Sequence, residues 1–239
     1  MVGQFLLSFL LQIAIIIPLL LFFMKERTKE NYLRILCIIV CYLVNCVFHI
    51  LPNILGFRII DGDWNWDGKI YGIICGIVLY FFFRQQLRDN DFFTLKQNKE
   101  GLKPAIKVAV LITSLFILLG ALGDNEFDVE ALLFQASVPG IDEEILFRGV
   151  LLGMMCSALR NDGTTWRTPA IIINGILFGL VHALMFQDSE LAFNAVMFVW
   201  TGLIGYALAY ITIKTRSILV PMLTHNLCNF LNNLVSMIL

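Results

Sequence analysis

Residues 131–155 read ALLFQASVPGIDEEILFRGVLLGMM, an apolar run long enough to cross ~30 Å of hydrocarbon. The run carries four charged residues near its middle, namely Asp142, Glu143, Glu144 and Arg148. An ionised group at the centre of a bilayer costs about 2.5–3.5 kcal/mol or more, so such groups are usually paired, face a wet cavity and serve a function. The stretch therefore predicts a membrane-spanning segment that contains a polar site.

Comparable apolar runs recur along the whole chain, which is 59% hydrophobic and only 15% charged, against about 25% charged residues in soluble domains. The runs predict about eight transmembrane helices: 3–24, 32–55, 69–84, 104–122, 131–157, 169–186, 191–213 and 217–238. No polar segment is long enough to fold separately. We therefore predict an all-α membrane domain over residues 1–239, with N-terminal helices in 1–122, a catalytic motif region in about 125–239, and helices that enclose a polar cavity.

The basic residues support this count independently, because cytoplasmic loops carry an excess of Lys and Arg. With eight spans and both termini outside, fourteen of the 17 basic residues fall on the cytoplasmic side, and only Arg58 and Lys69 fall on the outer side. The net charge of −1 indicates no nucleic-acid partner. We expect a multi-pass protein with its active-site helices buried in the bilayer.

Within the fifth predicted span, Glu144 and Arg148 are four residues apart, so they share a helix face and can form an ion pair. Glu143 points about 100° away from Glu144, which predicts that it is the unpaired carboxylate. Pro139, four residues earlier, is expected to open the helix or free a backbone carbonyl.

Two further apolar spans bring polar chemistry to a comparable depth. His182 lies in the sixth span, and His225 lies in the eighth with Asn229 on the same helix face. A carboxylate in a low-dielectric pocket can take a proton from water, and imidazole and amide groups can hold that water or stabilise an oxyanion. The same inventory could alternatively hold zinc through Glu143, His182 and His225, with water as the fourth ligand.

The three motifs are Glu143-Glu144-x-x-x-Arg148, Phe178-x-x-x-His182 and His225-x-x-x-Asn229, and in this order they resemble the CPBP (Abi) family. This family includes the type II CAAX prenyl endopeptidases, and the resemblance covers roughly residues 125–239. It implies an eight-span fold and an intramembrane endopeptidase that cleaves a membrane-associated peptide or protein.

The resemblance also implies roles for single residues. Glu143 is similar to the water-activating base, Glu144 with Arg148 to its supporting pair, and His182 to a second group that holds the water. His225 and Asn229 are similar to the oxyanion-stabilising pair. A metal-free, glutamate-type mechanism is favoured, with no cofactor, although zinc stays an alternative. The short loops favour a bacterial cell-membrane protein with a role in peptide processing or self-immunity.

Non-catalytic interpretations remain for the same residues. The acids and Arg148 could form a structural ion network, His182 could bond a backbone carbonyl, and His225 with Asn229 could join helices. His49 matches no motif, and a structural role is favoured for it. Asp142 could cap a helix that restarts after Pro139, or line the cavity.

At the level of the whole protein, a non-catalytic scaffold or immunity protein could bind its partner in the same cavity. A proton-coupled transporter is disfavoured because the polar groups are concentrated in the second half of the chain.

Overall fold

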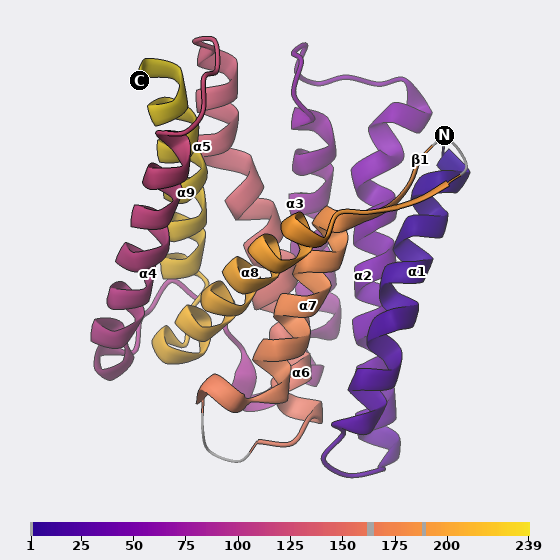
Figure 1. Cartoon of the computed structure of the whole chain (residues 1–239). Helices are drawn as coiled ribbons and strands as arrows, with labels where there is room; N and C mark the ends of the chain where they lie inside the picture. The colour runs from indigo at the N-terminus through magenta and orange to yellow at the C-terminus, as the bar shows by residue number, and fades with distance from the viewer. Residues whose placement is uncertain (1, 162–164, 188–189) are drawn as a thin grey trace.

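The computed structural model describes residues 2–161, 165–187 and 190–239, and it shows a bundle of helices with both chain ends on the same side (Figure 1). The main elements are α1 (Val2–Phe22), α2 (Lys29–Leu55), α3 (Trp66–Phe83), α4 (Lys99–Gly120), α5 (Val129–Glu144), a π-helix (Ile145–Leu151), α6 (Leu152–Ala158), α7 (Pro169–Ala183), β1 (Leu184–Gln187), β2 (Glu190–Phe193), α8 (Ala195–Thr215) and α9 (Leu219–Ile238). Single 3₁₀ turns lie at Arg84–Gln86, Arg88–Asn90 and Thr165–Arg167. The helix bounds agree with the predicted spans to within a few residues.

Five helices in the described ranges are long and apolar enough to cross a membrane, namely Val2–Phe22, Lys29–Leu55, Trp66–Gln86, Lys99–Gly120 and Ala195–Thr215. The helix Pro169–Ala183 is apolar but shorter. The chain is therefore a multi-pass membrane protein, and the count of eight spans stays a prediction. The α1–α2 connection lies at the end of the bundle opposite the termini (Figure 1).

The helices that carry the three motifs pack around the fifth predicted span, since α9 contacts α5, and α7 contacts the π-helix and α6. The α7 helix packs along α8, which crosses the bundle at a tilt, and α9 packs against both α4 and α5 (Figure 1). The α3 helix packs against α2 and α5. The fifth, sixth and eighth predicted spans are thus neighbours around one interior.

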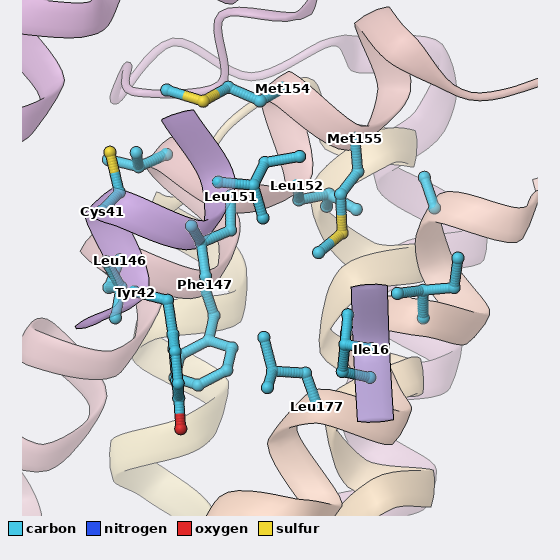
Figure 2. Close-up of a cluster of buried hydrophobic side chains, with 14 of the residues drawn as sticks. Ile16, Cys41, Tyr42, Leu146, Phe147, Leu151, Leu152, Met154, Met155 and Leu177 are labelled. Atoms are coloured by element: carbon cyan, nitrogen blue, oxygen red, sulfur yellow. The ribbon is translucent and has the colours of Figure 1, made fainter. Parts of the chain in front are cut away.

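A large apolar cluster supports these helices from the side of α1 and α2. Figure 2 shows Ile16, Tyr42, Phe147, Leu177 and other fully or nearly fully buried side chains meeting from α1, α2, the π-helix, α6 and α7. Burying a Leu, Ile or Phe side chain contributes about 1.5–3 kcal/mol in water, and in lipid the same close packing acts through dispersion contacts. The π-helix that follows the acidic motif is therefore held rigidly on its apolar side.

The fifth predicted span is irregular at a different place from the one expected. The α5 helix continues through Pro139, whereas a π-helix occupies Ile145–Leu151, directly after Glu144. A π-turn inserts an extra residue and rotates the following side chains, and such turns are frequent at functional sites. The expectation that Pro139 opens the helix was wrong.

A short hairpin was also missed by the sequence analysis. The predicted sixth and seventh spans ran through residues that form the antiparallel strands β1 and β2, with Leu184 opposite Phe193. Side chains of α1 satisfy the outer edge of β1, since the Phe186 amide donates to Ser8 Oγ and Gln12 donates to the Leu184 carbonyl. This polar pairing explains how a non-helical segment follows an apolar helix.

Close approach of α7 and α8 depends on glycine, which yields a stability prediction. A Cβ atom at Gly179 would lie 2.7 Å from the Phe198 carbonyl oxygen, whereas one at Gly202 would meet nothing closer than 3.5 Å. We expect Gly179→Ala to cost about 1–3 kcal/mol because backbone must shift. Gly202→Ala is the matched control and should be tolerated. Thermal unfolding of both variants in detergent checks this, and equal melting temperatures would contradict it.

Candidate active site

The predicted pair of Glu144 and Arg148 is confirmed and fully buried. Arg148 Nη1 lies 2.9 Å from Glu144 Oε1, and neither side chain is exposed to solvent. Arg148 Nη2 also donates to the Gly205 carbonyl at 3.0 Å, and its guanidinium lies 4.5 Å from the centre of the Phe178 ring. The cation is thereby tied to α7 and α8 as well as to its own helix.

Glu144 also joins the acidic motif to α9. Its Oε1 atom lies 2.9 Å from His225 Nδ1. The Glu144 carboxylate, which Arg148 also contacts, accepts this hydrogen bond, so Nδ1 of His225 is the donor and carries the proton. A neutral His225 ring therefore presents a lone pair at Nε2.

Glu143 is not unpaired, contrary to the sequence prediction. Lys69 of α3 places Nζ 2.7 Å from Glu143 Oε1 and 3.0 Å from Asp142 Oδ2. Lys69 had been counted among the residues on the outer side, yet its side chain is only 15% exposed and lies in the site. The error arose because helix periodicity predicts partners only along one helix, and Lys69 comes from another.

The free oxygen of Glu143 faces both histidines. Glu143 Oε2 is buried without a hydrogen-bond partner among the described residues. It lies 4.0 Å from His182 Nε2 and 3.8 Å from His225 Nε2. His182 Nδ1 must be a donor, because its neighbour at 2.8 Å is the Phe178 carbonyl. The non-catalytic interpretation predicted a hydrogen bond from His182 to a backbone carbonyl, and this bond is present. It also orients Nε2 of His182 toward the Glu143 carboxylate.

A cavity of about 380 Å³ contains this arrangement. Its polar lining is Lys69, Gln135, Glu143, His182, Thr201, His225 and Asn229, and its apolar lining includes Phe116, Phe134, Phe178, Met197, Trp200 and Ile204. With neutral histidines, three acceptor atoms converge on it, namely Glu143 Oε2 and the two Nε2 atoms. Such a site calls for a donor that can satisfy several acceptors, such as water, or for a cation.

Asn229 faces the same cavity from α9. Within the described part of the chain, its side-chain amide makes no hydrogen bond, so the NH₂ group is available to a ligand. The other expected oxyanion donor, His225, can donate from Nε2 only when its ring is charged, because Nδ1 already holds the proton toward Glu144. When His225 is neutral, Asn229 is therefore the only one of this pair with a proton to donate to a ligand.

Asn226, one residue after His225, joins α9 to α5. Its role was not predicted from the sequence. Its Oδ1 accepts from the Gly140 amide at 2.8 Å, and its Nδ2 donates to the Ser137 carbonyl at 2.7 Å. These two bonds satisfy backbone groups on either side of Pro139. Asn226 thus fixes α9 to α5 beside Pro139.

Asp142 lines the interior instead of capping a helix. It is 1% exposed, and its Oδ1 atom lies 3.0 Å from His49 Nε2 of α2, on the side away from Lys69. A Cβ atom at Gly72 would lie 2.1 Å from His49 Nε2 and 2.3 Å from Asp142 Oδ1. Gly72 therefore makes room for a polar contact, in addition to the helix packing expected of it.

The atoms of Glu143, His182 and His225 that face the cavity can be compared with the ligands of a zinc site. Glu143 Oε2 and the two Nε2 atoms are of the right type, and both Nδ1 atoms have the acceptor partners that zinc-bound histidines usually have. Ligand atoms around tetrahedral zinc lie about 3.4 Å apart, closer than the 3.8 and 4.0 Å measured here. Across the described ranges, no three acidic, His or Cys side chains form a ready-made metal group. These three residues would hold the ion if it binds.

Some sequence signal for Lys69 existed. It was one of only two basic residues on the outer side of the predicted topology, and it precedes Gly72 and Gly76 by three and seven residues, which places it on the face that packs against α5. Asn226 offered no comparable signal, since an Asn beside a motif is common.

Comparison with protein families finds a match over part of the chain. Residues 125–231 match the profile of the family described as type II CAAX prenyl endopeptidase Rce1-like. This segment contains all the motif residues predicted above but excludes Lys69 and His49. No curated protein and no solved structure matches the chain.

Proposed function

We propose, from the premise that segment 125–231 belongs to the type II CAAX prenyl endopeptidase Rce1-like family, that this protein is an intramembrane endopeptidase with Glu143 as its base. The observation that carries the proposal is the buried Oε2 of Glu143, which has no hydrogen-bond partner among the described residues and faces His182 and His225 in a cavity.

The chemistry requires only groups that already line the cavity. A water held by Glu143 Oε2 and His182 Nε2 gives one proton to the carboxylate while its oxygen attacks the scissile carbonyl carbon. The oxyanion that forms on the carbonyl oxygen accepts a hydrogen bond from the Asn229 amide, and a second from His225 when that ring is charged. Glu143 then returns its proton to the leaving amine as the carbon–nitrogen bond breaks.

The substrate class follows from the lining of the cavity. Aromatic and aliphatic side chains surround the polar centre, so an apolar peptide segment of a membrane-associated substrate would be accommodated. In this proposal the protein lies in a bacterial cell membrane with both termini outside, and peptide processing or self-immunity is its role.

A hydrolysis assay tests the proposal. Purified protein in lipid vesicles is incubated with a library of apolar peptides, and new amino termini are identified by mass spectrometry. We expect cleavage, and His182→Ala should reduce its rate by about 100-fold. Absence of cleavage, or equal rates in wild type and variant, would favour a non-catalytic binding role.

The same assay distinguishes the two mechanisms. Treatment with a strong chelator should leave the rate unchanged if Glu143 alone activates the water. Loss of activity that added zinc restores would instead assign Glu143, His182 and His225 as ligands.

A further inference from the structure

We propose that Lys69 is a positioning residue of the hydrolytic site, which selects Oε2 of Glu143 as the reacting oxygen. This inference rests on the proposed function and extends it to a residue outside the segment that matches the family. Lys69 lies on α3, whereas every residue that the motifs predicted lies on α5, the π-helix, α7 or α9.

The position of Lys69 determines which oxygen of Glu143 faces the histidines. A carboxylate has two equivalent oxygens, and free rotation would let either face the histidines. The Lys69 ammonium engages Oε1 at 2.7 Å, so Oε1 is turned away and Oε2 is left toward His182 and His225. Removal of the ammonium would free the Glu143 side chain to rotate about its terminal bond.

Lys69 also supplies the positive charge for two buried carboxylates. Asp142, Glu143 and Glu144 bring three carboxylates into a buried region where Arg148 is matched to Glu144. Lys69 bridges the other two, and its side chain is itself nearly buried. Without Lys69, the carboxylates of Asp142 and Glu143 would lie in a buried region with no Lys or Arg in contact among the described residues, at a large desolvation cost.

Lys69 is itself held in place by Asp142. Asp142 Oδ2 contacts its Nζ atom, and Asp142 Oδ1 contacts His49 of α2. The α2, α3 and α5 helices thus meet in a chain of contacts from His49 to Glu143. Gly72 permits this chain because no side chain intrudes at the crossing. Two carboxylates of α5 therefore hold the Lys69 ammonium between them, as a positioning residue requires.

The kinetic experiment compares Lys69→Met and Lys69→Arg with wild type. We expect Lys69→Met to lower kcat by about 100-fold because the base is misplaced, with KM changed by less than about threefold. Lys69→Arg keeps the charge and should stay within about tenfold of wild-type kcat. Lys103→Met, on an exposed part of α4, is the control and should leave kcat unchanged. Full kcat in Lys69→Met, or no rescue by arginine, would overturn the inference.

A second measurement decides the inference without any activity. Melting temperatures are determined for Lys69→Met, Glu143→Gln and the double variant in one detergent. The double variant should melt above Lys69→Met, because Glu143→Gln removes a carboxylate that has lost its cation. Simple additivity of the two changes would refute the coupling. Lack of peptide cleavage by wild type would refute only the proposed endopeptidase function.

Discussion

Glu143→Gln should abolish peptide cleavage, with kcat reduced by about 10³-fold or more, while the protein still inserts and folds. A positioned general base contributes typically about 10²–10⁴-fold, and a neutral amide cannot accept the proton of the attacking water. The substitution is nearly isosteric, and Lys69 keeps its contact with Asp142, so the helices should pack as before. The measurement is the steady-state rate on the peptide that wild type cleaves most rapidly.

Two controls make this result specific to the site. Glu126→Gln changes an exposed carboxylate on the α4–α5 connection and should cleave at the wild-type rate. The melting temperature of Glu143→Gln should stay near that of wild type, which would separate loss of chemistry from loss of structure. Cleavage by Glu143→Gln within a few-fold of wild type would end the assignment of Glu143 as the base.

Arg148→Met should produce the largest loss of stability in the chain. It removes the only Arg or Lys in contact with Glu144 among the described residues and leaves a fully buried carboxylate that keeps only its contact with His225. Breaking a buried pair from one side costs about 3–5 kcal/mol, because the remaining charge is uncompensated. The variant should unfold at a markedly lower temperature and expose α7 and α8 to proteolysis, since Arg148 also contacts Gly205 and Phe178.

The double variant Arg148→Met with Glu144→Gln separates stability from activity. Removing both charges should recover much of the melting temperature, because no buried ion is left alone. Activity should stay low, since the carboxylate that holds His225 Nδ1 is gone. Arg58→Met is the matched control, because the Arg58–Asp61 pair lies on an exposed loop where such pairs contribute about 0–1 kcal/mol. Equal melting temperatures for Arg148→Met and Arg58→Met would contradict the argument.

Residues that act within one helix could be predicted from sequence. The Glu144–Arg148 pair follows from the spacing of a single helix, and the bounds of the long helices follow from runs of apolar residues. The convergence of Glu143, His182 and His225 was also predicted. It rested on a physical cost, because polar groups in three apolar spans must find one another or water.

Residues that act between helices could not be predicted in the same way. The identity of the partner of Glu143 depends on which face of α3 packs on α5, and sequence spacing within α5 carries no information about that choice. The same holds for Asn226, whose two bonds to α5 exist only because α9 lies beside Pro139.

For this protein, the sequence by itself determined the membrane class, the helices and the groups that meet in the interior, since the cost of placing charge in hydrocarbon restricts those residues strongly. The tertiary structure decided which oxygen of Glu143 is free, which nitrogen of each histidine faces it, and that Lys69 contacts Glu143. The reason is that the contacts of Lys69, His182 and His225 with the two glutamates join atoms of different helices. Only the packing of those helices brings the atoms to within a few ångströms of each other.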